Sequence, residues 1–455
     1  MEVISTSQLE SWDKEHVWHP FTQMKGYRQE KPLIVERGEG SYLYDTEGNR
    51  YLDGTSSLWV NVHGHKKEEI DNAIKDQLGK VAHSTLLGLA NIPSILLAKK
   101  LAEITPPGLN KVFYSDSGAT AVEIALKIAY QYWQQQGREE FRRKRKFISL
   151  AEAYHGDTIG SVSVGGMDLF HRIFRPLLFE AIHAPAPYCY RCFLEKNRSS
   201  CSMECVGAVE QLLDRHHHDV AGFVIEPLVQ GAAGMLVAPE GYLSRISRLC
   251  RRYNVLLIAD EVAVGFGRTG KMFACDHEGV EPDLMCLAKG LTGGYLPLAA
   301  TMTTDVIYDA FSGEIEEFKT FYHGHTYTGN PLACAAALAN LELIEKSDFI
   351  GGLREKISFV ADGLAKFWDL DHVGDIRQKG MMIGIELVED RDSKRPYPPG
   401  ANIGHRVILE ARKNGLIIRP LGNVIVIMPV LSMNLPELGK VLRITYNAIK
   451  KVTGG

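Results

Sequence analysis

The sequence of 455 residues lacks a long uninterrupted apolar run, and its first residues lack the basic and then apolar layout of a signal peptide. These absences argue against a membrane-spanning helix and favour a cytoplasmic protein. The chain also lacks a strong charge of either sign, with 51 basic and 55 acidic residues and a formal net charge of -4. Without such a charge there is no broad attraction to nucleic acid or to an anionic membrane, so we expect small molecules as partners.

Cysteine is scarce as well, with eight residues in the chain, and a reducing compartment would keep these as thiols. Disulfide bonds are therefore not expected to hold the fold. Four of the eight nevertheless cluster in the sequence, namely Cys189, Cys192, Cys201 and Cys205. Their spacing leaves two interpretations open, reduced thiols on a surface excursion or ligands of zinc or an iron–sulfur cluster. We assign no metal to the active site.

The chain does contain an alternation of short apolar runs with longer segments of helical periodicity. This alternation is typical of a mostly parallel sheet flanked by helices, so the sequence predicts an α/β fold. We expect helices over 121–129 and 243–253, and strands at 111–114, 147–150, 222–225, 255–259, 284–287 and 298–302. The basic run 142–146 is interpreted as a solvated helix end.

Both ends of the chain have a sequence pattern that differs from the alternation in the middle. Residues 40–52 resemble a hairpin that turns at 47–49, and a long helical stretch that begins after Pro331 is followed by strands with interspersed glycine. We expect a large domain at residues 61–335 and a smaller α+β domain built from residues 1–60 and 336–455.

Two residues that follow apolar runs indicate the chemistry. Lys289 stands between such a run and a glycine-rich turn, and Asp260 ends another. A lysine that can form a Schiff base and an aspartate that can hold a pyridinium nitrogen are the minimum protein contribution to pyridoxal 5'-phosphate (PLP) chemistry. A buried aspartate keeps its charge only if it is paired. The alternative for this acidic strand end is a metal site, as in phosphotransferases.

Two further segments would lie at the same edge of the sheet. The turn 115–120 precedes a predicted helix and could bind a phosphate through backbone N–H groups and the helix dipole, or it could be a capping turn. Tyr154 could stack on a cofactor ring, or pack within a loop. The segment 265–270 matches the pattern G-x-G-x-x-G, but no convincing crossover helix follows it, and we reject a dinucleotide site.

Taken together, several motifs resemble those of class III (ω-amino) aminotransferases of PLP fold type I, over nearly the whole chain. They are 116–119, 154–157, 226–227, 260–262 with 265–270, 289–290, and 325–326 with 329–331. Within that family, the segments 18–23, 53–59 and 63–64 resemble members that convert 8-amino-7-oxononanoate to 7,8-diaminononanoate in biotin synthesis, and the chain, including Leu58, Trp59 and the cysteine-bearing segment, resembles their Bacillus-type branch. The resemblance implies PLP as cofactor and a homodimer with shared active sites.

The resemblance also implies roles for single residues. Lys289 would form the Schiff base, Asp260 would pair with the pyridine nitrogen, and Tyr154 would stack on the ring. The other implied cofactor-binding residues are Gly118, Ala119 and Glu226, with His325 and Thr326 from the neighbouring subunit. The implied substrate pocket comprises Trp59, Phe21, Tyr154, Gly324 and Arg419, of which Arg419 would pair with the distal carboxylate of the oxononanoate.

One departure from the family pattern concerns the amino donor. Many members have tyrosine where this chain has Phe21, and they take the amino group from S-adenosylmethionine. Because Phe21 removes a hydroxyl from the pocket mouth, we favour L-lysine, the donor of some members of the Bacillus-type branch. The alternatives are another ω-aminotransferase, acting on ornithine, 4-aminobutyrate or a diamine, and a non-catalytic PLP-binding protein.

Overall fold

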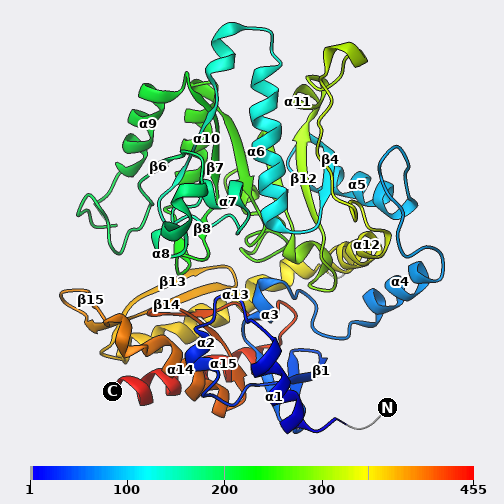
Figure 1. The fold of residues 1–455 in the computed structure, drawn as a ribbon. Helices are drawn as coiled ribbons and strands as arrows, with labels where there is room; N and C mark the ends of the chain where they lie inside the picture. Colours follow the sequence, from blue (N-terminus) through cyan, green and yellow to red (C-terminus); the bar gives the residue numbers. More distant parts are fainter. Residues whose placement is uncertain (1–3, 199, 347, 455) are drawn as a thin grey trace.

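The computed structural model describes residues 4–198, 200–346 and 348–454, and a seven-stranded sheet forms the centre of its larger part (Figure 1). In sheet order the strands are β4 (Leu109–Ser115), β12 (Ala299–Thr304), β11 (Leu284–Leu287), β10 (Leu256–Asp260), β7 (Val220–Ile225), β5 (Lys146–Leu150) and β6 (Ile182–Ala184). The strand β12 is antiparallel to both of its neighbours, and every pair from β11 to β6 is parallel. The predicted α/β class with a mostly parallel sheet is thus confirmed.

All six predicted strands exist, and their ends differ from the prediction by at most two residues. The seventh strand, β6, was not predicted, because three residues are too few to show a period. Successive strand residues face different cores: Phe223 and Ile225 pack into one cluster and Val224 into the other. A strand that is buried on both faces is apolar throughout, which explains why these runs were visible in the sequence.

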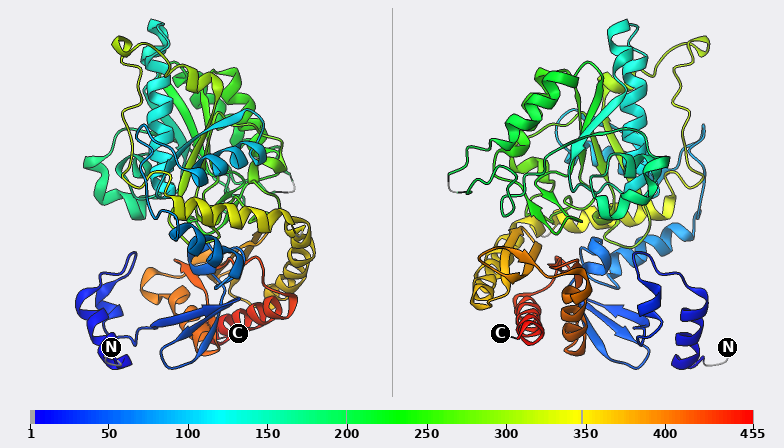
Figure 2. Two further views of the ribbon diagram at one scale, coloured as in Figure 1. Left: turned by 90° about the vertical axis from the view of Figure 1, so that its right-hand side faces the viewer. Right: turned by 60° about the vertical axis from the view of Figure 1, so that its left-hand side comes forward.

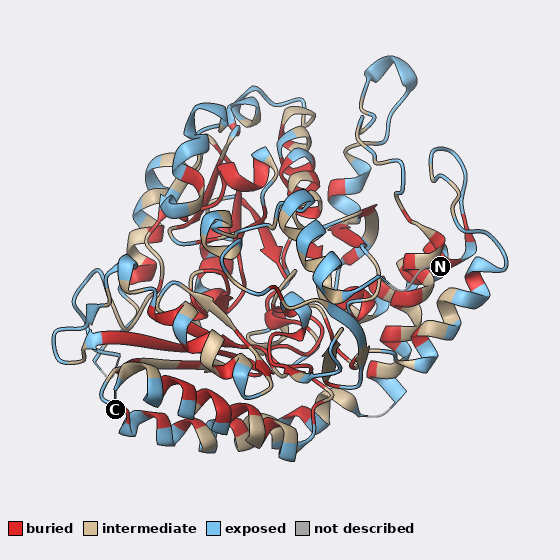
Figure 3. Cartoon of the chain, turned by 60° about the horizontal axis from the view of Figure 1, so that its bottom comes forward, coloured by how far each residue is buried: buried red, intermediate tan, exposed pale blue. Residues whose placement is uncertain are grey.

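Helices cover both faces of the sheet (Figures 1 and 3). The long helix α6 (Gly118–Gln134) packs on one face, and α5 (Ile92–Ile104), α9 (Cys205–His216) and α10 (Tyr242–Arg252) belong to the core of the other. The remaining helices of this part are α4 (Glu68–Leu78), α7 (Ile159–Ser163), α8 (Asp168–His171), α11 (Asp305–Asp309) and α12 (Pro331–Lys346), with a small hairpin of β8 (Val229–Gln230) and β9 (Leu236–Val237). Among the described residues, no helix is long and apolar enough to cross a membrane.

The two ends of the chain lie together below the central sheet, as Figures 1 and 2 show. The predicted hairpin is β2 (Tyr42–Asp45) and β3 (Arg50–Asp53), and β3 pairs in parallel with β16 (Leu416–Ile417) from the other end of the chain. The other elements here are β1 (Val35–Glu39), β13 (Val373–Lys379), β14 (Met382–Asp390), β15 (Arg395–Pro396), β17 (Arg419–Leu421), β18 (Val424–Ile427), α1 (Thr6–His16), α2 (Met24–Tyr27), α3 (Ser56–Trp59), α13 (Phe349–Leu364), α14 (Ile403–Lys413) and α15 (Leu435–Thr453). Exact domain boundaries at residues 60 and 335 remain a proposal.

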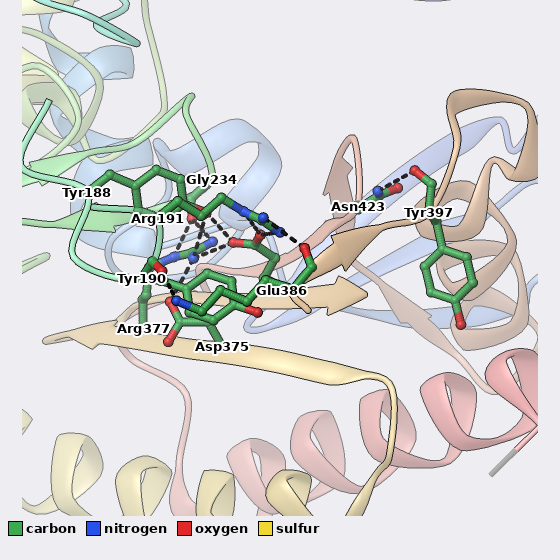
Figure 4. A network of polar contacts seen from close by, with 10 residues as sticks. Tyr188, Tyr190, Arg191, Gly234, Asp375, Arg377, Glu386, Tyr397 and Asn423 are labelled. Atoms are coloured by element: carbon green, nitrogen blue, oxygen red, sulfur yellow. Dashed lines mark hydrogen bonds and ion pairs between the residues drawn. The ribbon is translucent and has the colours of Figure 1, made fainter. Parts of the chain in front are cut away.

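A buried polar network joins the C-terminal sheet to the segment that carries the clustered cysteines (Figure 4). The Arg377 guanidinium donates to Glu386 at 2.6 Å and to the backbone oxygen of Gly234 at 2.9 Å. Arg191, from the cysteine-bearing segment, donates to the same Glu386 carboxylate at 2.9 Å, and the Tyr188 hydroxyl also donates to it. One carboxylate with three donors anchors this segment to β14.

The structure corrects one prediction, that the basic run 142–146 is a solvated helix end. Lys144 is buried rather than solvated, with 4% of its surface exposed. Its ammonium donates to three backbone oxygens, those of His217 at 2.8 Å, Val220 at 3.2 Å and Asn254 at 2.7 Å. The run ends a short 3-10 turn and leads directly into β5, so the chain crosses the edge of the sheet where these oxygens converge.

Candidate active site

A cavity of about 740 Å³ opens at the carboxyl edge of the central sheet. Its walls come from segments that directly follow β4, β5, β10 and β11, together with the α3 segment near the N-terminus. Parallel strands end at the same edge of a sheet, so residues distant in sequence meet there. Seven of the predicted site residues line the cavity: Trp59, Gly118, Ala119, Tyr154, Glu226, Asp260 and Lys289.

Lys289 lies at the floor of this cavity, two residues after the end of β11. Its ammonium nitrogen is 5.0 Å from the centre of the Trp59 ring. Burial lowers the pKa of Lys289, and the nearby charges of Asp260 and Glu226 oppose that shift only in part. A lysine with a lowered pKa is more often neutral, which is the form that can act as nucleophile and base.

Asp260 ends β10 and is held from two sides. Its Oδ1 accepts from the backbone N–H of Val262 at 3.1 Å, and its Oδ2 lies 2.7 Å from Nδ1 of His155. Burial disfavours a charged His155, but the hydrogen bond and charge of Asp260 outweigh burial and raise the pKa of that imidazole. Sequence reasoning did not give His155 a role, although it stands in the same motif as Tyr154.

Glu226 follows β7 and is buried, and its partners are backbone groups. One carboxylate oxygen accepts from the N–H of Tyr154 at 3.1 Å and the other from the N–H of Gly231 at 2.9 Å. Burial raises its pKa to about 7, and the charge of Asp260 adds to this whereas His155 opposes it. The contacts of Glu226 therefore fix the two loops that carry Tyr154 and Gly231 at the cavity.

An anion cradle is formed by the N-terminus of α6. Ser117 caps the helix by accepting from the N–H of Thr120, and the N–H groups of Gly118 and Ala119 belong to the first turn, where a helix supplies no partner. A side chain at Gly118 would meet Val262 at 2.5 Å, so only glycine fits there. These N–H groups and the helix dipole suit a phosphate.

The cavity mouth is aromatic. The Tyr154 hydroxyl donates to Asp157 at 2.7 Å, and its ring lies 6.4 Å from Phe170. Phe21 is 57% exposed and its ring centre is 5.4 Å from that of Phe170. Phe21 therefore contacts a neighbour of Tyr154 and is not among the residues that line the cavity.

Four other predicted site residues also lie outside the cavity wall of this chain. Gly324 and Thr326 are exposed, and the half-buried His325 places its Nδ1 at 2.8 Å from Oδ2 of Asp116, a residue of the wall. Arg419 begins β17 and is half-buried, and burial lowers its pKa while Tyr154 opposes that shift. The predicted roles of these four residues remain predictions.

The residues of the cavity fit PLP. Asp260 is a buried carboxylate that can pair with a pyridinium nitrogen, Lys289 is an amine of lowered pKa, and the start of α6 offers N–H donors that have no partner within the helix. These groups match the ring nitrogen, the aldehyde and the phosphate of that cofactor.

The clustered cysteines are not among the residues that line the cavity, and they lie between β6 and the first residue of α9. All four are free thiols, and the Cys201 thiol donates to Glu204 at 3.0 Å. Within the described ranges, no group of three or more histidine, cysteine or acidic side chains is arranged to hold a metal ion. Both interpretations of this cluster therefore stay open.

Comparison with known proteins shows that the similarity to other proteins is not limited to the cavity and extends over nearly the whole chain. A family model described as aminotransferase class-III matches residues 24–449. A relative from Geobacter sulfurreducens, named adenosylmethionine-8-amino-7-oxononanoate aminotransferase, is 54% identical to this chain over 99% of both sequences.

Solved structures agree with the sequence relatives. A crystal structure of the protein of the same name from Methanocaldococcus jannaschii is 51% identical, with a TM-score of 0.93, and the match covers 98% of this chain and 99% of that one. The omega transaminase from Pseudomonas jessenii in complex with PMP, the amino form of PLP, has a TM-score of 0.93 at 33% identity over 98% of both chains.

Proposed function

Because this chain belongs to the class III aminotransferases, we propose that it aminates 8-amino-7-oxononanoate to 7,8-diaminononanoate, a step of biotin synthesis. Membership confirms fold type I, PLP as the cofactor and transamination as the reaction. The observation that carries the choice of ketone is the 54% identity, over nearly the full length of both chains, to a relative named for that substrate. An alternative ketone would be favoured only if a relative named for that ketone matched this chain equally well.

The residues of the cavity divide the work of transamination. When bound, PLP supplies an electron sink that makes the C–H bond at the donor's amino carbon acidic. Asp260, oriented by His155 at 2.7 Å, holds the pyridine nitrogen in its protonated form. Lys289 accepts a proton at Nζ and returns it, which is general acid and base catalysis by one positioned amine. Gly118 and Ala119 bind the phosphate, and Tyr154 covers the ring.

The substrate end of the site is built from apolar and basic groups. Trp59, Phe21 and Gly324 would line the path of the aliphatic chain. Arg419 would bind the distal carboxylate, because its planar guanidinium can donate two parallel hydrogen bonds. In a homodimer, His325 and Thr326 of one subunit would complete the phosphate site of the other. We place this enzyme in the cytoplasm.

For the amino donor we propose L-lysine in preference to S-adenosylmethionine. The support is Phe21, which brings an aromatic ring but no hydroxyl to the mouth of the cavity. The printed name of the relative from Geobacter sulfurreducens contains adenosylmethionine, which makes that compound the rival donor.

A matrix of donors and ketones tests both parts of the proposal. The purified protein loaded with PLP is given L-lysine, S-adenosylmethionine or ornithine with 8-amino-7-oxononanoate, and separately with 2-oxoglutarate as acceptor. We expect 7,8-diaminononanoate, identified by mass spectrometry, to form fastest with L-lysine. Diamine formation only with S-adenosylmethionine would reverse the donor choice, and turnover of 2-oxoglutarate without any diamine would refute the proposed ketone.

A further inference from the structure

The segment that carries Trp59 has an unusual backbone. Four consecutive residues, 56 to 59, have φ angles of 44°, 53°, 86° and 70°, although none of them is glycine. Single residues visit this left-handed region, but a run of four is sterically unfavourable for L-amino acids. Such strain persists only where the surrounding structure enforces it. The rest of the fold must therefore hold this turn in place.

Asp53 is the first part of that restraint. It ends β3 and is completely buried. Its Oδ1 accepts from the N–H of Ser57 at 2.9 Å, and its Oδ2 accepts from the Ser57 hydroxyl at 2.7 Å. Nε2 of His65 lies 3.0 Å from the same Oδ2. One carboxylate thus fixes the middle of the left-handed turn through both the backbone and a side chain.

Arg268 is the second part, and it comes from a distant segment. It is 2% exposed, and its guanidinium donates to the Ser56 hydroxyl at 2.8 Å and to the backbone oxygen of Asn61 at 2.7 Å. The Ser56 hydroxyl in turn donates to the backbone oxygen of Met428 at 2.9 Å. The first residue of the turn and the segment just after it are therefore tied to the same buried cation.

The restrained turn places Trp59 in the wall of the candidate active site. The indole is 6% exposed, lines the cavity and lies 5.0 Å from the Lys289 ammonium nitrogen. A Cβ at Gly231 would come within 3.3 Å of the indole, so the absence of a side chain there leaves room for the ring. Leu58, the residue with the largest φ of the four, is 48% exposed and is not among the residues that line the cavity.

We infer that Asp53, together with Arg268, is a positioning residue for catalysis, and that it acts by holding the left-handed turn Ser56–Trp59 so that the indole stays against Lys289. The inference rests on the proposed aminotransferase chemistry at Lys289 but not on the identity of the ketone. It adds to the residues of the proposed function two that do not line the cavity, Asp53 and Arg268.

Glycine rescue is the test, because glycine adopts left-handed φ without strain. Asp53→Asn should lower kcat/KM at least fivefold for any amine that the wild type converts. Adding Leu58→Gly should restore kcat/KM to within about twofold of the Leu58→Gly single variant, since an unstrained turn needs less restraint. Leu58→Ala removes most of the same side chain but keeps a left-handed residue that is not glycine, and so keeps the backbone strain. Glu195→Gly places glycine at a left-handed position far from the cavity, with φ of 54°. Neither should restore activity.

Amide exchange gives a readout that does not depend on activity. The N–H group of Trp59 donates to the backbone oxygen of Thr55, and those of Val60 and Asn61 donate to the backbone oxygen of Ser56. In the protein without and with PLP, Asp53→Asn should speed hydrogen–deuterium exchange of these amides, and Leu58→Gly should slow it again. A wild type that converts no amine would sink the proposed function, yet this measurement would still decide whether Asp53 restrains the turn.

Unchanged kcat/KM and unchanged exchange in Asp53→Asn would overturn the inference, as would equal restoration by glycine and alanine at position 58. Should Asp53→Asn fail to fold, Ser57→Ala replaces it, because that change removes only the hydroxyl contact of an exposed side chain. We expect a smaller loss of kcat/KM in Ser57→Ala, again restored by Leu58→Gly, and the absence of either effect would count against the restraint.

Discussion

Lys289 has a φ of 46°, lies two residues after the end of a buried strand and lines the cavity. Its identity as the reactive lysine was predicted from the apolar run before it and the glycines after it. The hydrogen bond from His155 to Asp260 was not predicted, because 105 residues separate the partners. A single sequence shows which groups follow strands, whereas their pairings depend on how loops cross the sheet edge.

His155 provides a test of the cofactor site at the residue scale. Replacing His155 with Phe removes the 2.7 Å hydrogen bond to Asp260 and leaves a carboxylate that is less well held. Loss of a charged hydrogen bond costs about 1.5–3 kcal/mol, so kcat should fall about ten- to a hundredfold. His155→Asn keeps a donor near the position of Nδ1 and should retain most of kcat. Equal losses in both variants would show that the hydrogen bond is not what matters.

Arg419 provides a test of substrate recognition. Arg419→Met should raise the KM for 8-amino-7-oxononanoate about ten- to a hundredfold, because a bidentate contact to the carboxylate is lost. The methyl ester of the same substrate is the matched control, since it has no carboxylate and its KM should hardly change. A KM that rises equally for acid and ester would assign Arg419 a purely structural role. Steady-state kinetics with both compounds decides between these outcomes.

At the scale of elements, six of the seven strands of the central sheet were predicted, and two irregular segments were not. The strands of the central sheet are apolar because both of their faces are buried, and this leaves a clear signal. The turn Ser56–Trp59 contains no glycine, so nothing in its sequence indicates left-handed backbone. It is enforced by Arg268, which lies 212 residues from Ser56. Lys144 was misjudged for a similar reason, since its three oxygen partners are distant in sequence.

Lys144 tests the closure of the sheet edge between the 3-10 turn Glu139–Arg143 and β5. Lys144→Met leaves three backbone oxygens without this donor and should lower the free energy of unfolding by about 1–3 kcal/mol at pH 7. Arg142→Met, in the same basic run but exposed, should change it by less than about 0.5 kcal/mol. Urea unfolding of both variants makes the comparison.

The same position predicts a dependence on pH. Burial lowers the pKa of Lys144 to about 8 in the folded protein, below the usual 10.5. Between these values the unfolded chain binds more protons than the folded one, so this group makes the wild type more stable as the pH rises from 8 to 10.5. The stability difference between wild type and Lys144→Met should therefore widen over that interval. A constant or shrinking difference would contradict the assigned burial of the ammonium.

For the whole molecule, the sequence predicted that both ends of the chain pack together, and the pairing of β3 with β16 bears this out. The arrangement of subunits is a separate question, because contacts between two subunits are not contacts within one chain. His325 lies 2.8 Å from Asp116 of its own chain, so a role within one subunit competes with the proposed role across a homodimer. Only a measurement on the assembled protein separates these two roles.

Hybrid dimers make that separation. Lys289→Ala subunits and subunits with both His325→Ala and Thr326→Ala should each be poorly active alone. If the sites are shared, a hybrid of the two contains one site with Lys289, His325 and Thr326 all intact, so mixing with subunit exchange should restore up to about a quarter of wild-type activity. If His325 and Thr326 serve their own subunit, neither site of the hybrid is complete, and mixing should restore nothing.

The central claim, that Lys289 and its surroundings aminate 8-amino-7-oxononanoate, is tested most directly in a single half-reaction. The protein is converted to its pyridoxamine phosphate form, freed of donor and mixed with the ketone, and its visible spectrum is followed. We predict that the absorbance of lysine-bound PLP returns while one equivalent of 7,8-diaminononanoate forms per active site, and that Lys289→Ala shows neither on this timescale. An unchanged spectrum with no diamine in the wild type, or full diamine formation in Lys289→Ala, would contradict the account.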